Sequence, residues 1–206
     1  MNLDRVTVTR KSGREPFRNG AADLGFDLLT FWQWSSSDLL SNSMRGVLAE
    51  YLVARALRAN ADGVREEWAS YDLTTENGTK VEVKSAGYLQ SWYQKQLSPI
   101  FFVVPKRRPW DANTNRLGDV PARQADVYVF ALLSHKDKAT VDPMDVSQWT
   151  FFVLATSVLD GRKRSQHSIA LATLARLCGS AVSYSGLRDA VIEAARCGCS
   201  TYGDAS

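Results

Sequence analysis

The sequence predicts an α/β domain in which helices flank a central sheet. Two apolar runs, 126–133 (DVYVFALL) and 149–155 (WTFFVLA), have the unbroken hydrophobicity of strands that are buried on both faces. A segment of helical periodicity precedes these runs and two follow them, which favours an α/β or α+β sandwich over a doubly wound array. The 206 residues, 45% of them hydrophobic, suit one core. We therefore predict a single domain, 1–206.

The first part of the chain is predicted to be an appendage followed by a helix. Glycines and a proline interrupt residues 1–36, which we interpret as an appended N-terminal segment of strand or loop. Ser37-Asp38 is a plausible helix start. Apolar residues at helical spacing then predict a longer helix from Ser43 to Asn60, which ends at the Asn60–Gly63 segment.

A β-hairpin is predicted next. Glu67 to Thr74 and Thr79 to Ala86 are strand-like, and Asn77-Gly78 is a turn sequence between them. A short apolar strand, Pro99 to Val104, follows the hairpin. The polar stretch from Pro105 to Arg123 is long for an ordinary connection, and loops of that length are often functional or mobile.

The chain is predicted to end in helices. After the two apolar strands, Ser168 to Cys178 and Tyr184 to Arg196 have helical patterns and are separated by Gly179. Residues 156–206 therefore form a predicted C-terminal helical part. With the hairpin, the short strand and the two apolar runs, the sheet is expected to have about five strands.

Several classes of protein are disfavoured by composition. No run of eighteen apolar residues is present, and the N-terminus has no signal-like apolar stretch, so we expect a cytoplasmic protein without a membrane span. Three cysteines make a disulfide framework unlikely to form, and neither histidine has a zinc-like spacing from them. No glycine-rich nucleotide-binding string is present.

Basic residues point modestly to a polyanionic partner. The net charge of +3 permits such a partner without requiring it. Lys106, Arg107 and Arg108 are consecutive, and 162–164 is a second cationic triplet. A solvated loop is the alternative interpretation of either triplet. Together with the acidic site described next, they favour nucleic acid.

The chemistry is concentrated in the predicted hairpin. Glu82 and Lys84 are two residues apart on a strand, so they lie on the same face, whereas Val81 and Val83 face the opposite side. A carboxylate and an ammonium are costly to bury on a central strand without a role. The alternative is a surface hairpin with alternating charges and no catalytic meaning.

Loop length decides whether Asp72 lies beside Glu82. A two-residue loop, 77–78, would put the two carboxylates on opposite faces. A three-residue loop, 76–78, makes Asp72 oppose Glu82, and a glycine suits the last position of such a loop, where Gly78 stands. We therefore predict the three-residue loop. Two neighbouring carboxylates repel each other unless a cation lies between them, and oxygen ligands suit Mg²⁺ or Mn²⁺.

The hairpin and the helix before it resemble the PD-(D/E)XK nuclease superfamily, which has the restriction-endonuclease-like fold. The signature of that superfamily is an acid on a first helix, then an Asp and an (Asp/Glu)-x-Lys on consecutive strands. Glu50 corresponds to the helix acid, Asp72 to the first strand acid, and Glu82-Val83-Lys84 to the second motif. The resemblance covers about residues 37–133 in element order. Tyr71 precedes Asp72 where the motif has Pro, which weakens the match as a string.

The resemblance implies a fold, a metal and a set of roles. It implies a restriction-endonuclease-like central mixed sheet of about five strands flanked by helices. It also implies that Asp72, Glu82 and the backbone carbonyl of Val83 bind Mg²⁺ or Mn²⁺, with Glu50 acting directly or through water. Glu50, Asp72, Glu82 and Lys84 are thus the predicted catalytic residues.

The predicted function is that of a magnesium-dependent endonuclease acting on DNA, and a restriction, repair or mobile-element setting is implied by the resemblance alone. The alternatives are a junction resolvase, an RNA-cutting enzyme, or a non-catalytic DNA- or protein-binding member of the fold. A homodimer is compatible with this prediction. Lys106, Arg107 and Arg108 are candidate nucleic-acid contacts, and Gln94 and Gln96 are weaker ones, because polar surface is their commoner use.

Overall fold

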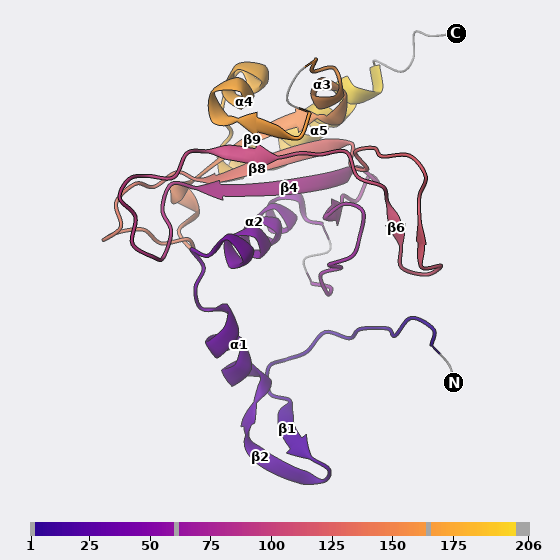
Figure 1. The fold of residues 1–206 in the computed structure, drawn as a ribbon, viewed down its shortest axis with the longest axis vertical. Coiled ribbons are helices and arrows are strands. Elements are labelled where there is room, and N and C mark those ends of the chain that lie inside the picture. Colours follow the sequence, from indigo (N-terminus) through magenta and orange to yellow (C-terminus); the bar gives the residue numbers. More distant parts are fainter. Residues whose placement is uncertain (1–2, 60–61, 164–165, 201–206) are drawn as a thin grey trace.

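The computed structural model describes residues 3–59, 62–163 and 166–200. Its centre is a mixed four-stranded sheet of strand order β3-β4-β8-β9 (Figure 1). The strands are β3 (Leu73–Thr74), β4 (Lys80–Gly87), β8 (Val127–Leu133) and β9 (Trp149–Ala155). β4 runs parallel to β8, whereas β3 and β9 are antiparallel to their neighbours. The predicted mixed α/β architecture is therefore confirmed.

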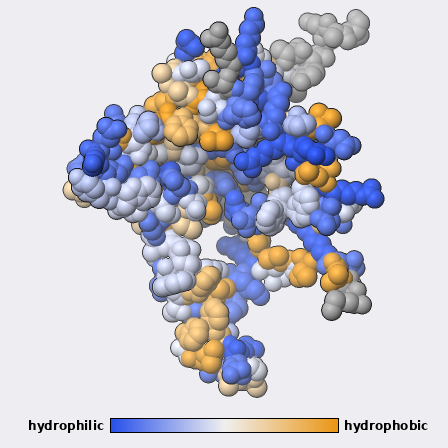
Figure 2. All heavy atoms as spheres, in the orientation of Figure 1, coloured by the Kyte–Doolittle hydropathy of each residue, from blue (hydrophilic) through white to orange (hydrophobic). Residues whose placement is uncertain are grey.

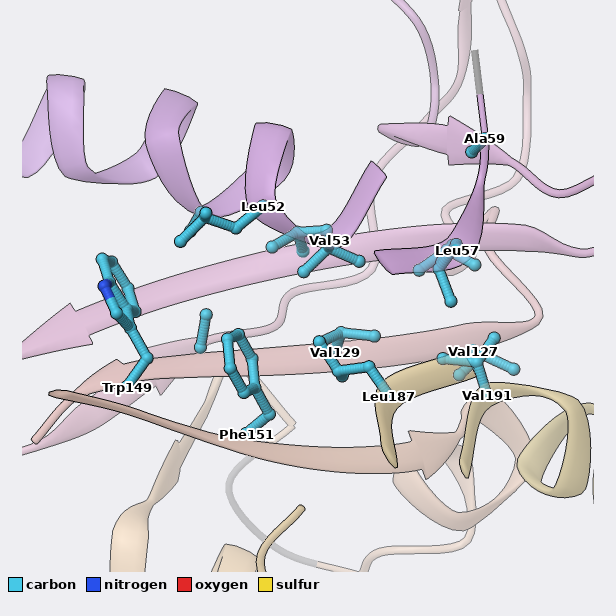
Figure 3. Close-up of a cluster of buried hydrophobic side chains, with 14 of the residues drawn as sticks. Leu52, Val53, Leu57, Ala59, Val127, Val129, Trp149, Phe151, Leu187 and Val191 are labelled. Atoms are coloured by element: carbon cyan, nitrogen blue, oxygen red, sulfur yellow. The ribbon is translucent and has the colours of Figure 1, made fainter. Parts of the chain in front are cut away.

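One face of the sheet is covered by α2 (Asn42–Leu57) and α5 (Leu187–Ser200). Figure 3 shows Leu52 and Val53 of α2 packed over the strands, with Leu187 and Val191 of α5 against the same cluster. Every residue of β8 is buried, as its apolar run predicts for a strand covered on both faces. This packing fixes the position of α2 beside β4.

The opposite face is covered by α3 (Thr156–Asp160), α4 (Leu171–Cys178) and a small sheet of β5 (Phe101–Val103) with β10 (Ser168–Ala170). The central sheet has four strands, so the expected sheet of about five strands is not confirmed. β5 pairs with β10 and buries Phe102 against the central sheet instead of joining it. Residues 168–170, predicted to be helical, are this partner strand.

Two short 3-10 turns in the described residues are η1 (Val146–Gln148) and η2 (Tyr184–Gly186).

The helix α2 begins and ends close to its predicted bounds. The Ser41 hydroxyl accepts a hydrogen bond from the Met44 N–H at 3.3 Å and caps the N-terminus. Arg58 ends the helix in a left-handed conformation with φ of 54°. The predicted end at Asn60 lies outside the described residues. Ser37-Asp38 does not begin a helix, since Ser37 is the C-cap of the preceding helix.

The N-terminal segment forms a hairpin and a helix that project from the sheet (Figure 1). They are β1 (Pro16–Asn19), β2 (Ala22–Asp27) and α1 (Leu28–Ser36). No residue of α1 is buried, and Figure 2 shows hydrophobic side chains on this projecting part. α1 is absent from the sequence prediction, which interpreted residues 1–36 as strand or loop. No helix in the described ranges is long and apolar enough to cross a membrane.

The polar stretch 105–123 is a second projecting hairpin and not an irregular loop (Figure 1). Its strands are β6 (Trp110–Asp111) and β7 (Arg116–Leu117), and an isolated bridge joins Arg107 to Ala122. Asn115 has a φ of 53° in the turn. The Trp110 ring packs edge-on against that of Trp68, with centroids 5.9 Å apart.

The hairpin of β3 and β4 has the predicted register. Leu73 pairs with Val81 and Thr74 pairs with Lys80, which is the register of a three-residue loop. The Thr75 N–H donates to the Thr79 carbonyl at 2.9 Å, and the Gly78 N–H donates to the Thr75 carbonyl at 2.9 Å. The loop 76–78 is therefore confirmed. Its first strand is much shorter than predicted, because only two residues of 67–74 pair with β4.

Gly78 is expected to be the residue on which this register depends. Its φ is +81°, and a Cβ at this position would have no atom within 4 Å, so a substitution acts through backbone conformation alone. Since αL costs an L-residue roughly 1–2 kcal/mol, we expect Gly78→Val to lower the unfolding free energy by at least that much. Gly78→Asn is the control, because Asn tolerates αL. Thermal denaturation measures both, and equal stability of the two variants would contradict this role.

Candidate active site

Asp72 lies one residue before β3, where the ladder between the two strands becomes irregular. Its N–H donates to the carbonyl of Val81, the residue already paired with Leu73, at 3.1 Å. Its carboxylate then accepts a hydrogen bond from the Val83 N–H at 2.6 Å. The side chain thus takes a backbone donor that a continuing strand would have used. This holds the Asp72 carboxylate against the edge of β4, beside Glu82.

Glu82 and Lys84 project from the same face of β4 and form an ion pair through Oε1 and Nζ. Both are half-buried, with exposed side-chain fractions of 17% and 30%. Val81 and Val83 alternate with them and are buried in the core beneath α2. The predicted alternation along this strand is therefore confirmed. Glu82 also pairs in register with Tyr128 of the parallel strand β8.

Glu50 reaches the site from α2 and is not in bulk solvent. Its side chain is 15% exposed and is bound by Arg65. Arg65 Nε donates to Oε2 at 2.5 Å, and Nη2 donates to Oε1 at 2.9 Å. The hydrogen bonds to Glu50 raise the pKa of Arg65, and the charges of Glu50, Asp72 and Glu67 add to that effect. The charge of Glu50 also raises the pKa of the Asp72 carboxyl, so the helix acid and the hairpin acid interact electrostatically.

The environment of Asp72 disfavours its ionised form. Burial raises the pKa of the Asp72 carboxyl to about 7, and the charges of Glu82 and Glu50 act in the same direction. The hydrogen bond from Val83 and the charge of Lys84 oppose these effects without cancelling them. The acidic residues of the cluster are therefore not fully compensated by the cations beside them.

The residues present fit a hard divalent cation. The available donors are carboxylate oxygens and the Val83 carbonyl, and Mg²⁺ and Mn²⁺ prefer such oxygen ligands. Among the described residues, no three His, Cys, Asp or Glu side chains are grouped so that they alone could hold a metal ion. Because Glu50 is bound by Arg65, a cation at this cluster would depend on Asp72, Glu82, a backbone carbonyl and water.

The predicted glutamine contacts lie in the loop that follows β4. The Gln94 amide nitrogen donates to the Tyr88 carbonyl at 3.2 Å and to Ser98 Oγ at 3.1 Å. Its Oε1 accepts from the Gln90 N–H at 2.7 Å. Gln94 therefore braces this loop from within, whereas Gln96 is exposed. A contact of either residue with nucleic acid stays a prediction.

The predicted cationic cluster is at the base of the β6–β7 hairpin. Lys106 Nζ lies 3.3 Å from an oxygen of Asp160. Arg108 Nε donates to the Gly118 carbonyl at 2.6 Å. All three side chains, including that of Arg107, are exposed. The structure thus places Lys106, Arg107 and Arg108 at the surface, and two of them also hold the hairpin. The second triplet includes Arg164, which lies outside the described residues.

Two residues of the cluster are absent from the sequence prediction. Arg65 stands in a segment without periodicity, fifteen positions from the carboxylate that it binds, so no spacing identifies it. Tyr128 is within an apolar strand and is buried, and burial raises the pKa of its hydroxyl, with the charge of Glu82 adding to the effect. The parallel pairing with β4 would have identified Tyr128, but strand order is not readable from one sequence.

The mixed sheet, with the carboxylates of Asp72 and Glu82 at its edge, fits a nuclease. A family model described as bacteriophage T4 endonuclease IV matches residues 26–173, which is more than half of the chain. The chain therefore belongs to the bacteriophage T4 endonuclease IV family. This membership supports a nuclease, without assigning the PD-(D/E)XK superfamily. A search of curated proteins gave no match.

The match contains the whole candidate site. Glu50, Asp72, Glu82 and Lys84 all fall between residues 26 and 173, as does the β6–β7 hairpin. The β1 strand and the start of β2 precede the match, and α5 follows it. The projecting N-terminal hairpin thus lies mostly outside the region that defines the family.

The raised pKa of Asp72 predicts how metal-free stability depends on pH. An unfolded Asp ionises near its usual pKa, whereas Asp72 in the folded protein ionises at about 7. Stability is therefore lost as the pH rises between these two values, and the loss is complete above the higher one. We expect Asp72→Asn to be more stable than wild type at pH 8 by up to about 4 kcal/mol, and nearly equally stable near pH 4.

Thermal unfolding in a chelator, across this pH range, measures that difference. Asn keeps an oxygen that can accept from the Val83 N–H, so the comparison isolates the charge. Added Mg²⁺ should then stabilise wild type at pH 8 and not the variant, because binding to the folded state alone raises stability. A pH-independent difference between the two proteins would contradict the assigned environment of Asp72.

Proposed function

We propose that the chain is a Mg²⁺- or Mn²⁺-dependent endonuclease that hydrolyses phosphodiesters of DNA, with a site of the PD-(D/E)XK type. The observation that carries this proposal is the hydrogen bond from the Val83 N–H that holds Asp72 at the edge of β4, where the charges of Glu82 and Lys84 act on its carboxyl group. The family is named for an endonuclease of a bacteriophage, which supports DNA as the substrate. Residues 1–206 would form one nuclease domain with an N-terminal appendage, 1–36, and a C-terminal helical part, 156–206.

The protein groups would divide the chemistry as follows. Asp72, Glu82 and the Val83 carbonyl would hold the cation, and Glu50 would support this set from α2. When bound, a divalent cation stabilises negative charge on the phosphate and lowers the pKa of water. Lys84 lies on the face of β4 that carries Glu82 and pairs with that carboxylate, whereas Lys80 on the same face lies over the Tyr71 ring. Lys84 can therefore orient the attacking water or stabilise the leaving oxygen.

A plasmid-nicking assay tests this proposal. The wild-type protein should convert supercoiled DNA to nicked or linear forms in Mg²⁺ or Mn²⁺, and a chelator should stop the reaction. An RNA of the same sequence, tested in parallel, distinguishes an RNA-cutting enzyme. If the protein binds DNA but cuts no substrate with either metal, the fold is a non-catalytic binding module and the proposal is wrong.

The cationic cluster 106–108 is expected to contribute to DNA affinity and not to sequence preference. Replacing Lys106, Arg107 and Arg108 with Gln removes three positive charges from the base of the β6–β7 hairpin. Because phosphate contacts release counterions, binding should weaken similarly for all sequences and depend less steeply on salt. Fluorescence anisotropy with a labelled duplex measures both quantities. An unchanged affinity and salt slope would show that the cluster is solvated.

A further inference from the structure

The side chain of Arg65 is more exposed than that of Lys84, and its orientation is fixed. It follows α2 in the segment that leads to the hairpin, and it binds both carboxylate oxygens of Glu50. Its side chain is 41% exposed, whereas that of Glu50 is 15% exposed. A bidentate pair of this kind fixes the plane of the guanidinium as well as its position. The charge is thus held beside Asp72 at the surface.

The pairing uses one edge of the guanidinium and leaves the other edge available. Arginine has five N–H donors in a rigid fork, and Glu50 takes one from Nε and one from Nη2. Within the described part of the chain, the hydrogen bonds of Arg65 all go to Glu50. Nη1 and the remaining Nη2 N–H therefore form a second two-pronged edge. Such an edge matches the geometry of a phosphate, which a lysine does not reproduce.

The acidic character of the site explains why the free guanidinium edge of Arg65 would be needed to bind a phosphate. A DNA phosphodiester that approaches Asp72 and Glu82 meets two carboxylates, and the ammonium of Lys84 is already paired with Glu82. Arg65 is also paired, but Glu50 binds the edge formed by Nε and Nη2 and leaves the edge that contains Nη1 unoccupied. A phosphate could therefore be bound without breaking the pair with Glu50.

We infer that Arg65 binds a backbone phosphate of the DNA substrate with the edge that Glu50 leaves free, and that Glu50 positions it. This inference rests on the proposed nuclease function and adds a substrate-binding residue to it. A purely structural alternative exists, in which the pair only ties the segment after α2 to that helix. The two roles differ in their effect on DNA affinity and its salt dependence.

Arg65→Ala, Arg65→Lys and Arg55→Ala separate these roles. Arg55 is the matched control, because it is an exposed arginine in the last turn of α2 and pairs with a carboxylate, Asp62, at 3.3 Å. Its side chain is 49% exposed, close to the value for Arg65, so its removal deletes the same charge together with a single-contact ion pair. Each protein is titrated against a fluorescein-labelled DNA oligonucleotide in a chelator, at several salt concentrations. Cleavage of the same oligonucleotide in Mg²⁺ is measured separately.

Arg65→Ala should weaken binding by about tenfold and lower the slope of log affinity against log salt by about 0.7–0.9, as expected for one lost phosphate contact. Arg65→Lys should recover the slope but only part of the affinity, because an ammonium lacks the fork. Arg55→Ala should stay close to wild type. The inference is overturned if Arg65→Ala keeps the wild-type affinity and slope, whatever its unfolding temperature, or if Arg55→Ala shows the same losses.

The binding measurement and the cleavage measurement test the role of Arg65 and the endonuclease activity separately. Absence of cleavage by a wild-type protein that binds DNA removes the endonuclease proposal, and the binding data still decide the role of Arg65. Normal cleavage with unchanged binding by Arg65→Ala removes the inference alone. A wild-type protein that does not bind the oligonucleotide at any salt concentration overturns the inference as well.

Discussion

Asp72→Ala and Glu82→Ala are each expected to reduce Mg²⁺-dependent DNA cleavage by at least about a thousandfold while the fold is kept. The two carboxylates are proposed to hold one cation, so removing either removes the electrostatic stabilisation that both provide together. Val81 and Val83 anchor β4 in the core and are unaffected by either substitution. Single-turnover cleavage of a labelled duplex at saturating protein measures the loss, and circular dichroism checks the fold.

Non-additivity is the sharper part of this prediction. When catalytic residues act as one unit, removing any one of them loses nearly all of the rate enhancement that they provide together. The Asp72→Ala, Glu82→Ala double variant should therefore be about as slow as either single variant. Glu76→Ala is the matched control, because Glu76 is a carboxylate of the same hairpin that instead pairs with Arg188 at 3.3 Å. Wild-type cleavage by purified Asp72→Ala or Glu82→Ala would end the assignment of these residues.

Lys84→Ala is expected to lower the cleavage rate by about a hundredfold to ten-thousandfold without preventing cation binding. This is the range in which positioned proton-transfer and charge-stabilising groups contribute. Lys84→Arg keeps the positive charge but changes its position, so it should recover little of the rate. The pair with Glu82 is lost in Lys84→Ala, which leaves that carboxylate free for a cation.

Rate and binding must be measured separately for Lys84. Single-turnover rates at saturating Mg²⁺ report the chemical step, and calorimetric titration with Mn²⁺ reports cation binding. We expect a large loss in the first and a small change in the second. A Lys84→Ala variant that cuts DNA within about threefold of wild type would remove Lys84 from the catalytic set, because a catalytic group contributes far more than that.

Local rules were sufficient to predict the hairpin and the strands that support it. The register followed from one glycine, since only a residue that tolerates positive φ closes a three-residue loop in this way. The buried runs of β8 and β9 followed from their continuous hydrophobicity. Alternation along β4 then placed Glu82 and Lys84 on one face.

Tertiary partners were not predictable in the same way. An apolar run such as 99–104 does not specify which strand it joins, and β5 pairs with β10 instead of extending the central sheet. Residues 168–170 matched a helical pattern, but pairing with β5 overrides that preference. The pair between Arg65 and Glu50 depends on how an irregular segment folds back over α2, and no periodicity reports such a contact.

A crystal of the protein soaked in Mn²⁺, with anomalous scattering used to locate the ion, tests whether Asp72 and Glu82 hold a metal. We expect an anomalous peak between the carboxylates of Asp72 and Glu82, within coordination distance of the Val83 carbonyl, and no peak at this position in Asp72→Ala crystals. A wild-type crystal in which these carboxylates bind no ion, while Mn²⁺ occupies another site, would contradict it.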